Sequence, residues 1–258
     1  MSGRRRRHFV PDILYHASNV SRLERYRRAG VLDAGPGRRV FLSAVESDAW
    51  AVAHRSSAGP VVLYVDAGRA RRSGTRFSRT RSGLWTAPRI GVRHVLNLKD
   101  GFREQVSAGG FLVRRDRGEV ELALVSCTRR WGTTWEIAKG KLEVGETPEQ
   151  AACRELQEEM GFEAPLRIGC DLGVVRYGFH TPEGEPRLKS MHVYLIEVDS
   201  PPERFCPAED EGIGEVQWFS VQDACGVVRH TSLKPLMRQL RRMFCEPPRP
   251  EANRPSGG

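Results

Sequence analysis

The chain has 258 residues, of which 39% are apolar and 28% are charged, a composition typical of globular proteins that excludes collagen-like and largely disordered classes. At roughly 100–200 residues per domain, this length predicts one large or two small domains, and we expect two. No apolar run approaches the roughly 18 residues that a membrane-spanning helix needs, and no apolar signal-peptide segment follows the basic N-terminus. We therefore expect a cytoplasmic protein without a membrane partner.

Charge is distributed unevenly along the chain. Residues 1–104 carry 21 lysines and arginines against 8 acidic residues, a net charge of +13, whereas residues 105–258 carry 20 against 24, a net charge of −4. A positive field over the first part attracts phosphate-bearing ligands or nucleic acid. Because 20 of the 21 basic residues are arginine, a high genomic GC content is an alternative explanation. No base-reading motif accompanies the charge, so only the charge supports RNA as a partner.

Composition divides the chain into four segments. We expect a basic tail at residues 1–8, a first domain at 9–98, a second domain at 105–245 and a disordered tail at 246–258. The polar stretch Lys99–Gln105 separates the two domains, where the charge balance changes sign.

The first domain has the pattern of a small α+β fold. Short β-type runs lie at Ile13–His16, Val40–Ser43 and Val61–Asp66, and a helical pattern lies at Asn19–Ala29. Glycine and proline separate these elements.

The second domain also mixes strands and helices, so the chain as a whole is of the α/β class. β-type runs lie at Gly109–Arg115, Glu121–Thr128, His192–Val198 and Glu215–Phe219, and an amphipathic helix lies near Leu233–Phe244.

The most informative stretch spans residues 140–162, with the sequence GKLEVGETPEQAACRELQEEMGF. Thr147 and Gln150 have the spacing of a capping box, and Pro148 stands at the first helical position, so a helix begins here. We expect it to end at Gly161, in the left-handed conformation that glycine adopts after a helix.

Glu155, Glu158 and Glu159 stand at positions i, i+3 and i+4 of this helix and therefore project from one face. Like charges so placed destabilise a helix by a few tenths of a kcal/mol per pair unless something neutralises them. Carboxylate oxygens suit Mg²⁺ or Mn²⁺, so we predict a divalent-metal site. A solvated acidic face is the alternative. The apolar stripe expected to face the core consists of Ala152, Leu156 and Met160.

The same stretch resembles the signature of Nudix hydrolases, Gly–x5–Glu–x7–Arg–Glu–U–x–Glu–Glu–x–Gly–U, where U is apolar. The matching positions are Gly140, Glu146, Arg154, Glu155, Leu156, Glu158, Glu159, Gly161 and Phe162. The resemblance extends over roughly residues 106–244 and implies an α/β/α sandwich around a mixed sheet.

This resemblance implies hydrolysis of a nucleoside diphosphate linked to another group, with Mg²⁺ or Mn²⁺ as cofactor. It assigns Glu155, Glu158 and Glu159 to the metal and makes Glu158, Glu159 and Arg154 catalytic. A glutamate supplies the general base, either within the signature or later in the chain, where we favour Glu211.

The resemblance also implies that an ion pair between Arg154 and Glu146 orients the signature, together with Gly140 and Gly161. Upstream, Lys139 stands in WEIAKGKLEVGE, a version similar to Nudix enzymes that cleave dinucleoside polyphosphates or diphosphoinositol polyphosphates. Lys139 is then a contact for a substrate phosphate, a solvated lysine being the alternative.

Residues 14–95 resemble the NAD-binding lobe of the RNA 2′-phosphotransferase family, a branch of the ADP-ribosyltransferase fold. The matching words are LYHAS (14–18), RAGVL (28–32), VFLS (40–43), VVLYVDA (61–67) and RSGLW (81–85). This resemblance implies that His16 binds the nicotinamide ribose of NAD and that Arg55 handles phosphate. Ala17 and Phe41 replace a glycine and a histidine of the family pattern, and a structural histidine at a strand edge is the alternative for His16.

Together these observations predict a pyrophosphohydrolase with a small-molecule nucleotide substrate. The substrate is either a dinucleoside polyphosphate, such as diadenosine tetraphosphate, or an ADP-ribose-type compound. One alternative is a bifunctional protein that binds NAD or ADP-ribose and is related to ADP-ribosyl or 2′-phosphate transferases. Another is a ligand-sensing regulator on a Nudix fold, and a third is an RNA-directed enzyme. The sequence assigns no oligomeric state.

Overall fold

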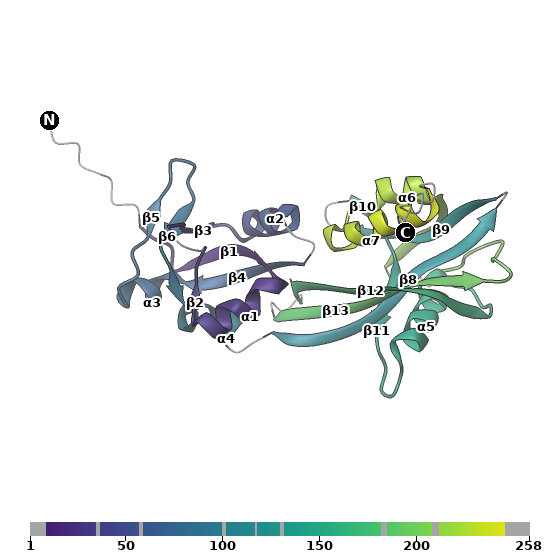
Figure 1. The fold of residues 1–258 in the computed structure, drawn as a ribbon, viewed down its shortest axis with the longest axis horizontal. Helices are drawn as coiled ribbons and strands as arrows, with labels where there is room; N and C mark the ends of the chain where they lie inside the picture. Colours follow the sequence, from purple (N-terminus) through teal and green to yellow (C-terminus); the bar gives the residue numbers. More distant parts are fainter. Residues whose placement is uncertain are drawn as a thin grey trace, which may run out of the picture. The chain divides into compact units, whose positions relative to one another are not determined.

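The computed structural model describes residues 9–34, 37–56, 59–99, 102–116, 118–129, 132–181, 185–207 and 212–245 (Figure 1). The chain forms two compact units that are not contiguous in sequence. The first unit contains residues 1–108, 141–145 and 173–192, and the second contains residues 109–140, 146–172 and 193–258. In the described ranges, no helix has both the length and the apolar character needed to cross a membrane.

The first half of the chain consists of short strands interleaved with helices. In chain order these are β1 (Ile13–Asn19), α1 (Val20–Ala29), β2 (Val31–Leu32), β3 (Val40–Leu42), α2 (Glu46–Ser56), β4 (Pro60–Asp66), α3 (Ala67–Arg72), β5 (Ser78–Arg79), β6 (Trp85–Ala87), β7 (Ile90–Gly91), η1 (Val92–His94) and α4 (Leu96–Lys99). β1 pairs antiparallel with β4, β6 lies between β3 and β5, and β2 pairs with β7. The predicted strands are present, and the strand at Ile13 continues to Asn19, the N-cap residue of α1.

The β1–β4 ribbon is covered on both faces. On one face Tyr15 and Tyr64 pack with α2, and on the other Leu14 and Leu63 belong to the main apolar core. Adjacent strand residues point to opposite faces. His16 therefore points away from α2, toward the side of the main core.

The ends of β12 (Leu166–His180) and β13 (Pro186–Val198) belong to the first unit. A Cβ atom at Gly178 would lie 2.7 Å from Val61 Cγ2, and one at Gly59 would lie 2.7 Å from the Arg176 carbonyl oxygen. The ring of His180 stacks on that of Tyr64, with centroids 4.8 Å apart. Residues 9–98 thus share their packing with a hairpin from the second half of the chain, a difference from the contiguous domains expected from the sequence.

A seven-stranded mixed sheet organises the second half, as predicted. Its order is β10-β9-β8-β13-β12, with β11 beside β8 and β14 beside β9. Helix α5 lies on one side of this sheet, and α6 and α7 lie on the other (Figure 1). The remaining elements are β8 (Arg103–Asp116), β9 (Glu119–Arg129), β10 (Gly132–Glu136), β11 (Ala138–Lys141), α5 (Pro148–Met160), β14 (Ile213–Ser220), α6 (Val221–Val227), η3 (Thr231–Leu233) and α7 (Lys234–Phe244).

Several strands of the second half differ from the sequence-based expectation: β8 and β13 begin earlier than predicted, and β10, β11 and β12 were not predicted. β8 begins at Arg103, inside the predicted break at residues 99–105; it pairs with β9 over residues 112–116 and has β13 as its other neighbour. β12 was not predicted, although residues 166–172 alternate in polarity and burial; three glycines interrupt the pattern along the strand, which pairs with β13. The predicted tails at residues 1–8 and 246–258 lie outside the described residues.

Candidate active site

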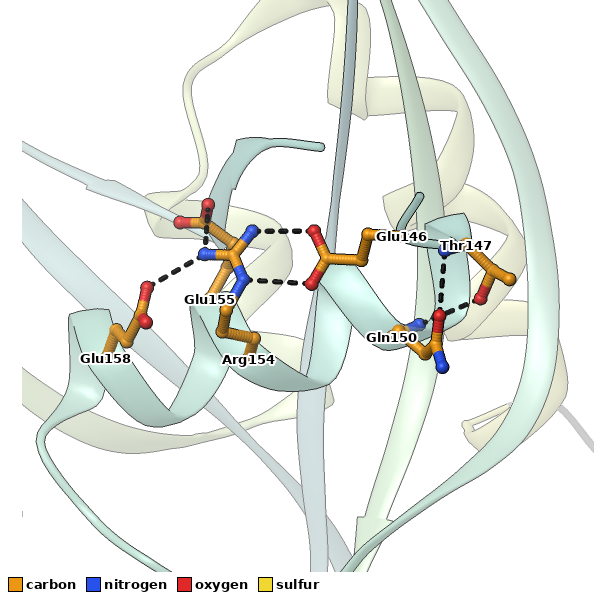
Figure 2. Close-up of polar contacts among 6 residues, drawn as sticks. All are labelled: Glu146, Thr147, Gln150, Arg154, Glu155 and Glu158. Carbon is orange, nitrogen blue, oxygen red and sulfur yellow. Dashed lines mark hydrogen bonds and ion pairs between the residues drawn. The ribbon is translucent and has the colours of Figure 1, made fainter. Parts of the chain in front are cut away.

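Helix α5 begins and ends as the local sequence predicts. The Thr147 hydroxyl accepts a hydrogen bond from the Gln150 backbone N–H at 3.3 Å, and the Gln150 side chain accepts one from the Thr147 N–H at 2.9 Å (Figure 2). Pro148 is the first helical residue, and Gly161 follows the helix with φ +65°. The predicted stripe of Ala152, Leu156 and Met160 is fully buried. These contacts fix the orientation of the acidic face.

Arg154 holds three carboxylates around one guanidinium group (Figure 2). Its Nε and Nη2 each donate to one oxygen of Glu146 at 2.9 Å, which confirms the predicted ion pair in a bidentate form. Its Nη1 donates to Glu155 at 2.9 Å and to Glu158 at 2.8 Å. The bond to Glu146, followed by those to Glu155 and Glu158, holds the pKa of Arg154 above its usual value. One positive charge thus faces three negative charges, and the cluster stays anionic.

Two glycines of the signature are required by close approach. A Cβ atom at Gly140 would overlap the carboxylate of Glu155, so only glycine lets this side chain lie against the backbone of β11. A Cβ atom at Gly161 would overlap the Cys206 carbonyl group, and the positive φ of Gly161 also favours glycine. The signature glycines therefore position Glu155 and the end of α5.

Glu159, the remaining carboxylate of this face, accepts a hydrogen bond from the Lys139 backbone N–H at 2.8 Å. The donor set Glu155, Glu158 and Glu159 consists only of carboxylate oxygens, and the space at Gly140 accommodates Glu155, so the chemistry fits a hard divalent cation. In their present rotamers, no three His, Cys, Asp or Glu side chains of the described ranges converge as a metal site. Glu155 and Glu158 instead face Arg154.

The part of the chain that contains this acidic helix matches a known protein family. Residues 103–244 match the model of the NUDIX domain, which is more than half of the chain. The chain belongs to the Nudix family. The α/β/α arrangement and the acidic helix α5 are therefore those of a Nudix hydrolase domain.

Individual relatives match parts of the chain. It is 32% identical over 127 residues to a putative mutator protein MutT4 of Mycobacterium tuberculosis, covering 46% of this chain and 47% of that protein. It is 28% identical over 160 residues to diphosphoinositol polyphosphate phosphohydrolase 2 of Mus musculus, covering 61% and 81%. A structure of the C. elegans Ap4A hydrolase matches at a TM-score of 0.45 with 23% identity, covering 54% of this chain and 96% of that one. The chain spans about half the length of the first of these relatives.

Lys139 lies next to the Nudix carboxylates, and its side chain is engaged within the protein. Its Nζ lies 3.4 Å from Glu136 Oε2, and the two side chains are only 18% and 7% exposed. The ammonium group of Lys139, on β11, is therefore held by Glu136, on β10, while the Lys139 backbone N–H contacts Glu159 of the acidic face. The predicted general base Glu211 lies outside the described residues.

The two residues predicted to bind NAD are not brought together. His16 Nδ1 donates to the Phe41 carbonyl oxygen at 2.8 Å, so the neutral ring carries its lone pair on Nε2. Burial, partly offset by this hydrogen bond, lowers the pKa of His16. Nε2 is buried and has no hydrogen-bond partner among the described residues. Arg55 is exposed in the last turn of α2, which covers the opposite face of the β1–β4 ribbon.

Sequence reasoning missed a second polar cluster, here called the Glu46 cluster, formed by Glu46, Trp50, Tyr64 and His180. Glu46 Oε1 accepts hydrogen bonds from the Tyr64 hydroxyl and from Trp50 Nε1, and it lies 4.0 Å from His180 Nδ1. Burial and the bond to Glu46 raise the pKa of Tyr64, while burial lowers that of His180. Tyr64 and His180 are 116 positions apart, so no spacing in the sequence signals this contact.

Proposed function

We propose that the protein is a divalent-metal-dependent pyrophosphohydrolase that cleaves a nucleoside diphosphate linked to another group. The observation that carries this proposal is the arrangement around Arg154, which gathers Glu146 from the loop before α5 with Glu155 and Glu158 from the second half of the helix. Membership of the Nudix family supports the same reaction class.

In this proposal Glu155, Glu158 and Glu159 hold Mg²⁺ or Mn²⁺. A cation held there would supply positive charge to the phosphate oxygens and a lowered pKa to water. The oxygen of a water molecule forms a bond to phosphorus, the anhydride P–O bond breaks, and the water proton passes to a carboxylate. We propose that a signature glutamate or Glu211 accepts this proton. The bidentate bond between Arg154 and Glu146 keeps the acidic face in position during the reaction.

Two substrate classes follow from different parts of the chain. The sequence around Lys139 is similar to that of Nudix enzymes acting on dinucleoside polyphosphates and supports such a substrate. The resemblance of residues 14–95 to an NAD-binding lobe supports an ADP-ribose-type compound.

A substrate panel tests this function on the full chain. Diadenosine tetraphosphate, ADP-ribose, NADH and nucleoside triphosphates are incubated with Mg²⁺ or Mn²⁺, and the products are separated by chromatography. We expect cleavage of at least one dinucleoside polyphosphate or ADP-ribose-type compound, and loss of that activity with EDTA. A folded protein that cleaves none of these compounds with either metal would contradict the proposal.

A second proposal concerns the first unit, which we infer binds the ribose of NAD or of an ADP-ribosyl group through His16. The supporting observation is the buried lone pair on Nε2, because a ribose hydroxyl is the kind of donor that this atom lacks. Calorimetry on the full chain with NAD and ADP-ribose tests it. His16→Ala should abolish the binding heat, whereas Arg55→Ala, on the other side of the ribbon, serves as control. The absence of binding heat at millimolar nucleotide would overturn this proposal and leave the hydrolase proposal intact.

A further inference from the structure

The sheet of the second unit has a hollow on its α7 side. We call it the β8–β13 pocket, because these two adjacent strands contribute its buried apolar lining, and its volume is about 340 Å³. Val113 of β8 and Leu195 of β13 are buried in this lining, and Phe244, the last residue of α7, also lines the pocket. Pockets that hold small molecules have volumes of roughly 300–1,000 Å³, so this one is suited to a compact ligand.

The pocket and the acidic helix α5 lie on opposite sides of the sheet. The Tyr194 hydroxyl donates to Glu149 of α5 at 3.1 Å, so Tyr194 points to the α5 side. Successive residues of a strand point to opposite faces, which turns Leu195 away from α5. Figure 1 accordingly shows α5 and α7 on different sides of the sheet. A ligand in the β8–β13 pocket is therefore separated from the carboxylates that we assign to the metal.

Arg115 brings a positive charge to this pocket. It follows Val113 by two positions on β8 and therefore points to the same face. Its partner on β9 is the apolar Val120, whereas Asp116 and Glu119 are paired with each other in register and point to the other face. Within the ranges that the structure describes, Arg115 forms no ion pair. Its guanidinium group is therefore available to an anionic group of a ligand.

Glu197 and Asp199 on β13 share a single cation, Arg167 on β12. Nη2 of Arg167 lies 2.8 Å from Glu197 Oε2 and 3.6 Å from Asp199 Oδ1. A Cβ atom at Gly169 would lie 3.1 Å from Glu197 Oε1, so the Glu197 side chain lies against β12, on the side away from Arg115. Two carboxylates and one guanidinium group leave a net negative charge at this end of the pocket.

The pocket thus has a positive pole on β8, a negative pole on β13 and an apolar lining. Neighbouring strands lie about 4.8 Å apart, so one small molecule reaches both poles. A carboxylate pairs with guanidinium in a bidentate manner, and an ammonium group completes the charge of the two acids. We propose that the β8–β13 pocket binds a free α-amino acid with an apolar side chain, its carboxylate on Arg115, its ammonium group on Asp199 and Glu197, and its side chain on Phe244.

Calorimetry on the full chain tests this proposal with L-leucine, L-methionine and L-phenylalanine as probes. The buffer contains EDTA, so that no metal held by α5 chelates the amino acid. We expect the tightest of the three to bind with a Kd of about 1 mM or below. The same amino acid should raise the Tm of the protein in proportion to the logarithm of its concentration once it exceeds this Kd.

Two pairs of variants test the poles. Arg115→Gln should weaken binding by at least about tenfold, because it removes a charge-assisted bidentate contact. Its control, Arg238→Gln, changes an exposed arginine of α7 outside the pocket. Asp199→Asn should weaken binding about threefold, because this carboxylate is exposed and Glu197 remains. Its control is Glu163→Gln, and both controls should bind within about twofold of the wild type.

Analogues of the tightest amino acid test the same contacts from the side of the ligand. The analogue without an amino group should bind the wild type more weakly than its parent does, and Asp199→Asn should not weaken it further. The analogue without a carboxylate should bind Arg115→Gln and the wild type equally. Each change of ligand then cancels one change of the protein, which marks a direct contact. A structural effect of the substitutions would not produce this pattern.

Three outcomes would overturn the proposal: no binding heat from any of the three amino acids at millimolar concentration, equal affinity of Arg115→Gln and Arg238→Gln, or an analogue without an amino group that binds as tightly as its parent. Should Arg115→Gln unfold, the analogue without a carboxylate decides the same point on the wild type, where an affinity equal to that of its parent would contradict the proposal. Pyrophosphohydrolase activity is measured separately, so failure of one proposal leaves the other standing.

Discussion

The cluster around Arg154 and the Glu46 cluster both bring carboxylates together with polar partners, but the partners differ in kind and in distance along the chain. Glu146 meets Arg154 eight positions later, and the cation keeps its charge at any pH that the folded protein survives. Glu46 meets two neutral donors and the ring of His180 from a distant hairpin. The first arrangement is local and its cation does not titrate, whereas the second depends on tertiary packing and contains a histidine whose pKa is lowered by burial. The predictions below test these differences.

The largest effect should come from removing the acidic face of α5. Glu158→Gln and Glu159→Gln should each lower kcat by at least about 10²-fold with the fold intact, because each removes a negative charge where electrostatics dominates the barrier. Steady-state kinetics under limiting Mg²⁺ measures kcat, and circular dichroism shows whether the fold is intact. Glu163→Gln, an exposed carboxylate just beyond the helix, is the control and should retain activity. Wild-type turnover in both signature variants would exclude these residues from the metal site.

A single methyl group at Gly140 should also reduce activity strongly. Gly140→Ala places a Cβ atom where the carboxylate of Glu155 lies, so this side chain must leave its contact with Arg154. We expect at least about tenfold lower kcat, since a displaced group is costly in a preorganised site. Gly226→Ala in α6, where a Cβ atom meets no other atom within 4 Å, is the control and should raise stability slightly. Equal activity of the two variants would argue against a fixed position for Glu155.

The ion pair between Arg154 and Glu146 should contribute measurably to stability. The side chains of Arg154 and Glu146 are 23% and 13% exposed, so the pair is neither fully exposed nor fully buried. Arg154→Ala should therefore lower the free energy of unfolding by about 1–3 kcal/mol. A double-mutant cycle with Glu146→Gln, read by urea unfolding, should show coupling between the two changes. Strict additivity would mean that the contact does not persist in solution.

The smallest effect should be the pH dependence contributed by the Glu46 cluster. Burial lowers the pKa of His180 below the usual histidine value of about 6.5, with Glu46 acting in the opposite direction. The unfolded chain therefore takes up a proton below about pH 6.5 before the folded chain does, and stability falls from there toward the lower folded pKa. The pKa values of His16, His54 and His94 are lowered as well. His180→Phe should therefore flatten the fall of Tm at acid pH without abolishing it. An unchanged profile would show that His180 does not contribute.

Much of the acidic helix was predictable because its determinants are close in sequence. The capping box at Thr147, the left-handed Gly161 and the apolar stripe follow from helical geometry over a few turns. The same geometry placed three glutamates on one face, and the Nudix resemblance supplied the pairing of Arg154 with Glu146, which the structure confirms. That resemblance, rather than spacing alone, indicated which of these residues act in hydrolysis.

Local pattern did not reveal the elements whose surroundings come from distant segments. Glycines interrupt the alternation of β12, which pairs with β13, and its end at His180 packs on Tyr64 in the first unit. Lys139 has the spacing of a substrate contact, yet folding sets its ammonium beside Glu136. The sequence by itself determined helix α5, its caps and its acidic face, because the residues involved lie about one helical turn apart, at 3.6 residues per turn. Tertiary structure alone decided the Glu46 cluster and the packing of residues 173–192 with the first half, because contacts between distant segments form only when whole elements pack together.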